Sequence, residues 1–130
     1  MSNSHAEKHA NFTPLRIAIV TVSDTRTEET DKSGAYLVDA VTTAGHSLVE
    51  KRIVKDDTYK LRAVVATHVA DDAVQVVLLT GGTGFTFRDN IVFCMPGSPG
   101  ACKTAWEGIV AQQLDSRHKP CNFVDKLKKV

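Results

Sequence analysis

The stretch AVQVVLLTGGTG, from Ala73 to Gly84, decides the fold class. Residues 73–80 are mostly valine and leucine, a pattern typical of a strand that is buried on both faces of a parallel sheet. The strand runs directly into a glycine-rich turn, where successive backbone amides can form an anion-binding nest because glycine has no side chain. The turn matches neither the Walker sequence nor the GxGxxG pattern. A glycine turn without a ligand is the alternative interpretation.

The segments before this stretch alternate between strand and helix patterns. The expected elements are a strand over 15–22, a helix from Thr30 or Asp31 to Ala44, a strand over 47–54 and a helix that Thr58 caps. Gly45 stands where a helix-ending glycine belongs. His68 lies on the apolar stripe of the second helix, so we expect a packed histidine rather than a metal ligand there.

The segments after the stretch continue the alternation. Residues 90–95 predict another strand, and Ser98 followed by Pro99 predicts the start of a helix. Cys102, Ala105, Trp106, Ile109 and Val110 are expected to line one face of that helix. Cys121 and Phe123 are expected to anchor the C-terminal segment. The whole order predicts an α/β fold with a mostly parallel sheet between helix layers.

The connection between the last two predicted strands is unusually short. Only nine residues, Gly81 to Asp89, lie between them, whereas a parallel crossover ordinarily needs about a dozen residues or more. Either the two strands are antiparallel, or a segment is missing. Both strands end in loops suited to a ligand, and parallel strands would bring these loops to the same edge of the sheet. We therefore expect a missing segment between Asp89 and Asn90.

Composition limits the function classes. The chain has 130 residues, 42% of them hydrophobic and 24% charged, with a formal net charge of +1. This predicts one domain, over 14–130, preceded by a flexible arm over 1–13. A near-neutral charge argues against a nucleic-acid surface, and the short apolar runs argue against a membrane span. Three cysteines without a CxxC pattern predict reduced thiols and a cytoplasmic protein.

Acidic residues follow the predicted strands. Asp24, Asp56 with Asp57, and Asp89 all fall at expected strand ends. Carboxylates near a phosphate site usually share a divalent cation, because they would otherwise repel the phosphate. Arg26 and Arg88 could neutralise phosphate charge. The residues alone therefore indicate a domain that binds a phosphorylated ligand with Mg²⁺, although each aspartate taken singly could be a solvated loop residue or a helix cap.

Several short motifs, taken together, resemble the MoaB/MogA family of molybdenum cofactor biosynthesis. They are Thr21-Val22-Ser23-Asp24, Asp31-Lys32-Ser33-Gly34, Thr80-Gly81-Gly82-Thr83-Gly84 with Thr86, Arg88 and Asp89, and Pro96-Gly97-Ser98-Pro99. Thr104-Ala105-Trp106-Glu107 and Pro120-Cys121-Asn122-Phe123 resemble the MoaB branch in particular. The resemblance implies a three-layer αβα sandwich that binds molybdopterin, a homotrimer or homohexamer, and, in catalytic members, adenylylation of molybdopterin with ATP and Mg²⁺.

The resemblance also implies roles for individual residues. Asp89 would be the main catalytic and metal-proximal acid and Asp56 the second, and replacing Asp89 by Asn should sharply reduce turnover while leaving the fold intact. The substrate-binding residues would be Ser23, Asp24, Thr80, Gly81, Gly82, Thr83, Gly84, Arg88, Pro96, Gly97 and Ser98. The family normally continues after Arg88-Asp89 with helices and a further strand that are absent here. A non-catalytic pterin-binding or scaffold protein of the same pathway is therefore the second hypothesis, and an unrelated phosphate-binding α/β module the third.

Overall fold

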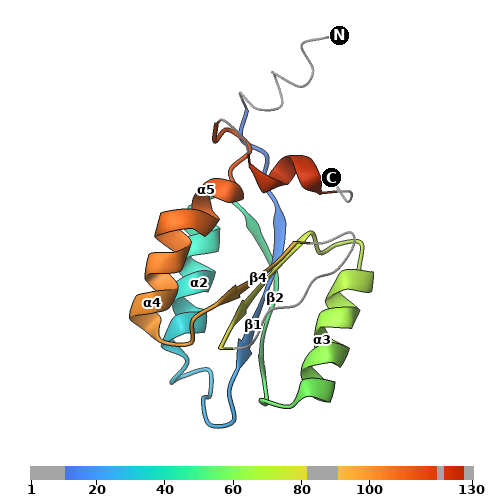
Figure 1. The fold of residues 1–130 in the computed structure, drawn as a ribbon, viewed down its shortest axis with the longest axis vertical. Helices are drawn as coiled ribbons and strands as arrows, with labels where there is room; N and C mark the ends of the chain where they lie inside the picture. The colour runs from blue at the N-terminus through green and yellow to red at the C-terminus, as the bar shows by residue number, and fades with distance from the viewer. Residues whose placement is uncertain (1–10, 82–90, 120–121, 128–130) are drawn as a thin grey trace.

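A four-stranded sheet forms the centre of the computed structural model, which describes residues 11–81, 91–119 and 122–127. The strands are β1 (Arg16–Val22), β2 (Ser47–Val54), β3 (Val76–Thr80) and β4 (Ile91–Met95). They lie in the order β2-β1-β3-β4, and each neighbouring pair is parallel. The predicted parallel sheet is therefore confirmed (Figure 1).

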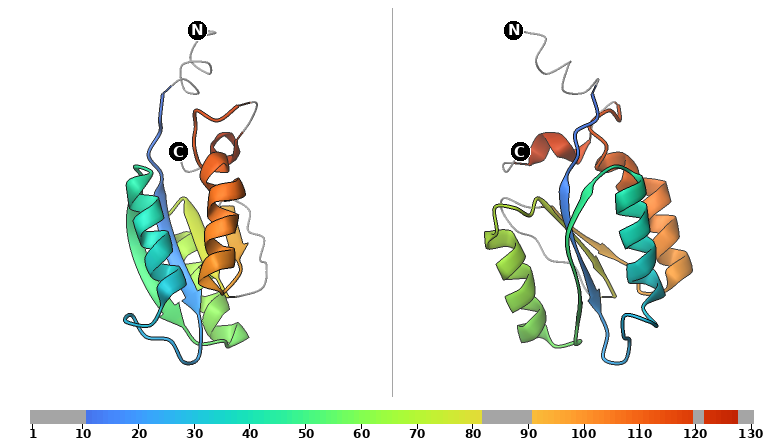
Figure 2. Two further views of the ribbon diagram at one scale, coloured as in Figure 1. Left: turned by 90° about the vertical axis from the view of Figure 1, so that its left-hand side faces the viewer. Right: turned by 180° about the vertical axis from the view of Figure 1, so that it is seen from behind.

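Helices cover both faces of the sheet. On one face lie α2 (Lys32–Thr43) and α4 (Pro99–Ala105), which continues through a π-helical turn (Trp106–Val110) into the short α5 (Ala111–Gln113). On the other face lies α3 (Thr58–Ala70), as the two views of Figure 2 show. A 3-10 turn (Phe123–Lys126) lies near the C-terminus. The expected three-layer αβα sandwich is confirmed. No helix in the described ranges combines the length and the apolar character needed to cross a membrane.

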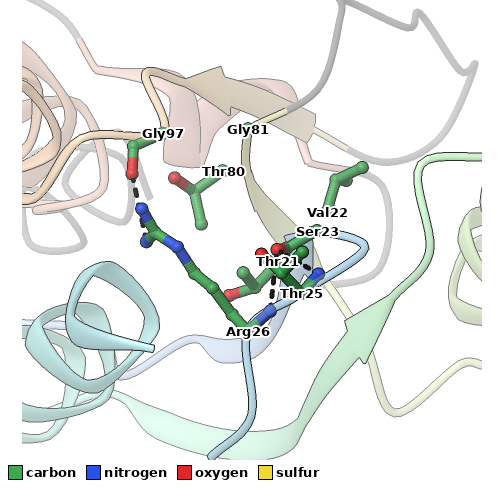
Figure 3. A pocket seen from close by; sticks show the side chains of 8 residues that line it. All are labelled: Thr21, Val22, Ser23, Thr25, Arg26, Thr80, Gly81 and Gly97. Carbon is green, nitrogen blue, oxygen red and sulfur yellow. Dashed lines mark hydrogen bonds between the residues drawn. The ribbon is translucent and has the colours of Figure 1, made fainter. Parts of the chain in front are cut away.

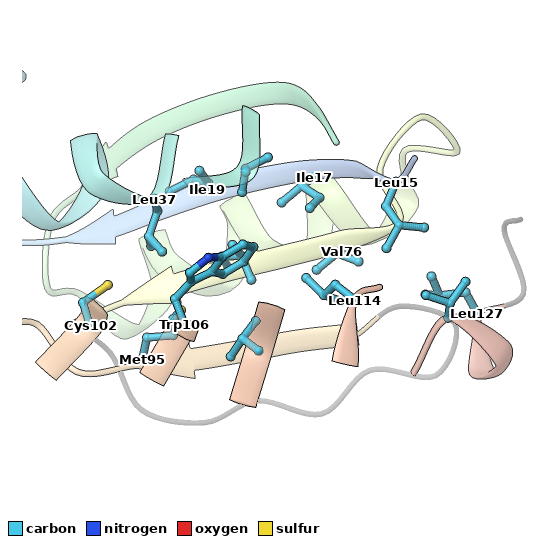
Figure 4. Packing of buried hydrophobic residues seen from close by; sticks show 14 residues of the cluster. Leu15, Ile17, Ile19, Leu37, Val76, Met95, Cys102, Trp106, Leu114 and Leu127 are labelled. Carbon is cyan, nitrogen blue, oxygen red and sulfur yellow. The ribbon is translucent and has the colours of Figure 1, made fainter. Parts of the chain in front are cut away.

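Alternation along β1 explains why its sequence is continuously apolar. Ile17 and Ile19 pack into the cluster under α2 and α4 (Figure 4), whereas Ala18 and Val20 pack into the cluster under α3. Successive side chains of a strand point to opposite faces, so a strand between two helix layers needs apolar residues at every position.

The helix boundaries follow local capping signals, with one correction. Asp31 caps α2 by accepting the Gly34 amide at 2.9 Å, and Gly45 follows the helix with a φ of 96°. The sequence predicts Thr58 as the cap of the second helix, but Asp57 is the cap and Thr58 is the first helical residue. The Asp57 carboxylate accepts the amides of Tyr59 and Lys60 in the first turn, and aspartate is a stronger capping residue than threonine.

The helix after Ser98 contains a second correction. Cys102, Trp106 and Val110 are buried as expected, but Ile109 is 63% exposed. Residues 106–110 form a π-helical turn, whose i→i+5 hydrogen bonds place more residues in each turn than an α-helix does. After Trp106 the next position that faces the core is therefore Val110, and Ile109 faces solvent.

The short connection joins two neighbouring parallel strands. Thr80 pairs with Met95 and Val76 with Ile91, so the chain must return along the length of the strand within residues 81–90. Four residue steps of a strand span about 13 Å, and ten residues can reach roughly 33 Å when extended. The connection is therefore long enough without an inserted helix. Residues 82–90 lie outside the described residues, and the missing segment after Asp89 stays a prediction.

The two ends of the described chain contact the domain. The Thr13 amide donates to Ser116 Oγ at 2.8 Å, and the same hydroxyl donates to the carbonyl of Asn11 at 2.9 Å. Phe123 packs edge-on against Phe93 of β4, with ring centroids 5.7 Å apart. Phe123 therefore contacts the domain but remains 40% exposed, and the residues of this segment that are buried in the core are Val124 and Leu127. Cys121 lies outside the described residues.

Candidate functional site

The strand order creates a switch point between β1 and β3. The chain leaves β1 toward β2 on one side, whereas β3 lies on the other side of β1. In open α/β sheets, ligands bind in the crevice outside the strand ends at such a point. A pocket of about 280 Å³ lies there, and Figure 3 shows its lining. Its lining residues are Thr21, Val22, Ser23, Thr25, Arg26, Thr80, Gly81 and Gly97. We call this hollow the switch-point pocket.

The loop after β1 forms one wall of the switch-point pocket. Ser23 Oγ accepts the backbone amides of Thr25 at 3.2 Å and of Arg26 at 3.1 Å, which tightens the loop. The Arg26 guanidinium reaches across the pocket and donates to the carbonyl of Gly97 at 3.4 Å (Figure 3). Among the described residues that line the pocket, Arg26 alone carries a positive charge. The wall therefore offers one cation and several hydroxyl groups.

The ends of β3 and β4 form the opposite wall. The Thr80 hydroxyl donates to the carbonyl of Pro96 at 2.8 Å, and the Gly81 amide donates to the carbonyl of Met95 at 3.0 Å. Gly81 has a φ of 90°, and a Cβ there would lie 2.7 Å from the carbonyl oxygen of Val22. Only glycine fits both conditions. The first glycine of the TGGTG sequence thus allows β1 and β3 to meet at the pocket.

A buried ion pair connects the loop after β1 to strand β2. Lys51 Nζ of β2 lies 2.6 Å from Asp31 Oδ2 and 2.8 Å from Glu28 Oε1. Burial is the largest single influence on both groups and disfavours their charges, but the hydrogen bonds and opposite charges around them together outweigh it. The pKa of Asp31 is therefore lowered, with the help of the Gly34 amide, and the pKa of Lys51 is raised, with the help of Glu28. Both groups are therefore charged at neutral pH. Lys51 fastens the loop that carries Arg26 to the sheet.

The ion pair can form because Gly34, next to it, has no side chain. A Cβ at Gly34 would lie 2.7 Å from Lys51 Cε and 2.8 Å from Thr21 Oγ1, and would also strike the Asp31 carboxylate. The Thr21 hydroxyl is buried without a well-formed hydrogen bond in the described structure, yet it lies close enough to help lower the pKa of Asp31. Ser33, the neighbour of Gly34, donates to the carbonyl of Gly97 at 2.8 Å. The Asp-Lys-Ser-Gly sequence thus supports the floor of the pocket.

Two of the predicted acids lie side by side at the same sheet edge. The Asp56 amide donates to Asp24 Oδ1 at 3.0 Å, and both residues are exposed. Mg²⁺ is usually held by one or two carboxylates together with substrate phosphates. Within the described ranges, no three His, Cys, Asp or Glu side chains gather into a metal cluster. The oxygen donors of Asp24 and Asp56 therefore fit a cation that arrives with a phosphate, rather than a cage made by protein alone.

The structure brings most of the described predicted residues together. Ser23, Thr80, Gly81 and Gly97 line the pocket, Pro96 supplies its carbonyl, and Asp24 and Asp56 lie beside it. Ser98 instead caps α4, where its hydroxyl accepts the Ala101 amide at 3.4 Å. The remaining predicted residues, Gly82, Thr83, Gly84, Arg88 and Asp89, lie outside the described residues.

Sequence reasoning missed part of the site. Thr21 and Thr25 line the pocket without having been predicted as binding residues, and Lys51 was not predicted to support it. Thr21 and Thr25 flank Ser23-Asp24, so their position next to a predicted loop was an available signal. Lys51 offered none, because its partner is 20 positions away along the chain.

Comparison with known proteins points to one family. Residues 18–92 match the family described as "probable molybdopterin binding domain". Molybdenum cofactor biosynthesis protein B of Escherichia coli K12 is 42% identical over 163 residues, covering 91% of this chain and 96% of that protein. The protein of the same name from Bacillus cereus is 49% identical over 75 residues, covering 58% of this chain and 44% of that protein.

Solved structures show the same fold. A crystal structure of molybdenum cofactor biosynthesis protein B superposes with a TM-score of 0.73 at 30% identity, covering 78% of this chain and 92% of that chain. A MoaB structure from Thermus thermophilus has a TM-score of 0.64 at 14% identity, covering 74% of this chain and 89% of that chain, and supports the fold alone.

The Escherichia coli relative has positions that this chain lacks. The aligned stretch, 163 residues, is longer than the whole chain of 130 residues. Some positions of that relative therefore have no counterpart in this chain.

Proposed function

The chain belongs to the family of probable molybdopterin binding domains, and from this premise we propose that it binds molybdopterin in molybdenum cofactor biosynthesis. The relative from Escherichia coli, which is aligned over 96% of its own length, supports the pathway. The observation that carries the proposal is the switch-point pocket, where Arg26 and a set of hydroxyl groups converge at the strand ends. One cation with several hydrogen-bond donors suits a single phosphate group, such as the terminal phosphate of molybdopterin.

The hydrogen bonds that already exist in the pocket indicate which groups are available to bind this phosphate. Ser23 Oγ already accepts two amides, so its own proton is available to donate to a ligand. The Gly81 amide and the Thr80 hydroxyl donate to protein carbonyls, so neither donates to a phosphate in this arrangement. With the residues that the structure describes, the Arg26 guanidinium makes one long hydrogen bond, at 3.4 Å, and it can turn its other donors to the ligand. We therefore propose Arg26 and Ser23 as the main phosphate-binding side chains among the described residues.

We further propose that the chain adenylylates molybdopterin. The terminal phosphate of molybdopterin would attack the α-phosphorus of ATP, a new P–O bond would form, and the bond to pyrophosphate would break. The attacking oxygen is already anionic, so alignment and charge neutralisation matter more than a general base. Mg²⁺, when bound, would neutralise phosphate charge, and Asp56 and Asp89 are the proposed ligands. Asp24 lies next to Asp56 and would help to orient it.

A non-catalytic pterin-binding or scaffold role is the second candidate. The aligned stretch of 163 residues exceeds the chain's 130, so part of the Escherichia coli relative is lacking here. We propose that the lacking segment follows Asp89, directly after the glycine-rich loop. A chain without it would keep the switch-point pocket while losing elements that help to close the site.

We propose that the chain acts in the cytoplasm as a homotrimer or homohexamer. The proposed oligomeric state is supported by the resemblance to the family. The proposed cytoplasmic location is supported by three cysteines that lack a CxxC pattern. Analytical ultracentrifugation of the purified chain tests the assembly, and a monomer at all concentrations would contradict it.

A turnover assay separates the two candidates. Purified protein is incubated with molybdopterin, ATP and Mg²⁺, and the adenylylated product and pyrophosphate are measured. The enzyme hypothesis predicts both products in equal amounts, with turnover lowered by roughly 10²- to 10³-fold in Asp56→Asn and sharply lowered in Asp89→Asn. Asp57→Asn is the matched control, because asparagine still caps α3, and should stay within about twofold of wild type. Binding of molybdopterin without turnover would support the scaffold role, and absence of binding would refute both.

A further inference from the structure

Three consecutive carbonyl groups at the end of β4 each accept a hydrogen bond from a neighbouring element. The carbonyls of Met95 and Pro96 accept hydrogen bonds from the residues that end β3, at 3.0 and 2.8 Å. The third carbonyl, that of Gly97, accepts the Ser33 hydroxyl of α2 at 2.8 Å. Each of the three carbonyls therefore has a well-placed donor without any contribution from the loop after β1.

The Gly97 carbonyl nevertheless has a second donor. The Arg26 guanidinium reaches it from the loop after β1, with Nη1 3.4 Å from the carbonyl oxygen (Figure 3). An N–H donor ordinarily lies about 2.9–3.0 Å from its acceptor, and a hydroxyl donor about 2.7–2.8 Å. The bond from Ser33 therefore has the usual length, whereas the bond from Arg26 is long and weak.

The two donors also differ in their freedom to move. Ser33 is fully buried in the first turn of α2, a helix that Asp31 caps and that the ion pair with Lys51 fastens to the sheet. Arg26 is partly exposed, and within the part of the chain that the structure describes it forms no ion pair. The helix therefore fixes the hydroxyl in place, while the guanidinium can turn into the pocket.

From this arrangement we propose that Ser33 is a positioning residue, which keeps Arg26 available to the phosphate of the ligand. The inference rests on the proposed function, in which Arg26 binds that phosphate. Because Ser33 satisfies the Gly97 carbonyl, Arg26 can leave this partly buried acceptor without stripping it of its donors. Without the Ser33 hydroxyl the carbonyl would depend on Arg26. An unsatisfied buried acceptor is costly, so the carbonyl would then hold the guanidinium away from the ligand.

A purely structural role for Ser33 predicts the opposite behaviour of Arg26. If the hydroxyl only braced the loop after β4, its removal would loosen this wall of the switch-point pocket and make the guanidinium more mobile. The proposal instead predicts a guanidinium that is held more tightly to the Gly97 carbonyl. The direction of the change at Arg26 therefore separates the two roles.

Chemical modification of Arg26 measures this direction without any ligand. Phenylglyoxal reacts with accessible guanidinium groups, and peptide mass spectrometry resolves Arg26 from the other arginines. In Ser33→Ala the modification of Arg26 should be slower by about three- to tenfold, the factor that one hydrogen bond contributes to an equilibrium. Ser116→Ala is the matched control, since Ser116 is also buried and donates to a carbonyl, that of Asn11 at 2.9 Å. It should keep the wild-type rate, and thermal melting confirms that both variants are folded.

Molybdopterin titration then tests whether Ser33 acts through Arg26. Ser33→Ala should weaken binding by roughly tenfold in the wild-type background but by less than about twofold in the Arg26→Gln background, because the guanidinium transmits the effect. An equal loss in both backgrounds would overturn the inference, and so would modification of Arg26 that is unchanged or faster in Ser33→Ala.

The two measurements keep this inference separate from the proposed function. If wild-type protein binds molybdopterin but Ser33→Ala leaves the modification rate of Arg26 unchanged, the proposed function stands and the role of Ser33 falls. If the modification rate falls as expected but wild-type protein does not bind molybdopterin, Ser33 still positions Arg26 and the proposed function falls.

Discussion

Replacing Lys51 by methionine should destabilise the fold through the charge that it leaves behind. The Asp31 side chain is fully buried, and Lys51 Nζ lies 2.6 Å from its Oδ2. Removal of one partner of a buried ion pair typically costs about 3 kcal/mol or more, which for a chain of this length lowers the melting temperature by roughly 10 °C. Lys103→Met, at an exposed position of α4, is the control and should change stability by less than about 0.5 kcal/mol.

The pH dependence of this loss identifies its cause. Burial alone raises the pKa of Asp31, and the hydrogen bonds from Lys51 and Gly34 bring it below its usual value. Without Lys51 the pKa rises, so the deficit is largest at neutral pH and shrinks as falling pH protonates Asp31. Urea denaturation at pH 7 and at about pH 4 measures both values.

A double variant supplies the decisive comparison. Asp31→Asn in the Lys51→Met background removes the unpaired charge and keeps an acceptor for the Gly34 amide. It should therefore be more stable at pH 7 than Lys51→Met alone. A double variant that is no more stable, or a deficit that is independent of pH, would refute the reasoning and indicate lost packing instead.

Two further predictions concern the same fold. Gly34→Ala should cost about 1–3 kcal/mol, because its Cβ would lie 2.7 Å from Lys51 Cε. Gly100→Ala in α4 has nothing within 4 Å and should stabilise the chain by up to about 1 kcal/mol. Equal effects in thermal melts would contradict this contrast. His46 Nδ1 accepts the Leu15 amide at 3.0 Å, and burial lowers the pKa of His46. The unfolded chain then binds a proton that the folded chain does not, so the unfolding free energy should fall as pH drops below about 6.5. His46→Gln should flatten this slope in urea titrations, and an unchanged slope would exclude His46 as its source.

The elements whose signals are local could be predicted from the sequence. The apolar run of β1 indicated a strand buried on both faces, and Ser98 with Pro99 marked the start of α4. The glycine-rich turn after β3 marked one wall of the pocket, because the carboxyl ends of parallel strands meet at one edge. Each of these features depends on a few adjacent residues, so a short stretch of sequence is enough to predict it.

The features that depend on pairing across the fold could not be predicted. Lys51 meets Asp31 only because β2 lies beside β1 in one particular register, and the sequence does not fix that register. The exposure of Ile109 depends on a π-helical turn, which the apolar spacing does not reveal. The hollow between β2 and α3 likewise forms only when α3 folds back along β2.

The affinity of the purified chain for molybdopterin tests the central claim, that the switch-point pocket binds this ligand, most directly. Equilibrium titration of wild type, Arg26→Gln and Lys103→Gln gives the three dissociation constants. We predict that wild type and Lys103→Gln bind alike and that Arg26→Gln binds roughly 10- to 100-fold more weakly, because it loses a charged hydrogen bond to the phosphate. Equal affinity in all three proteins, or no binding by wild type, would contradict the claim.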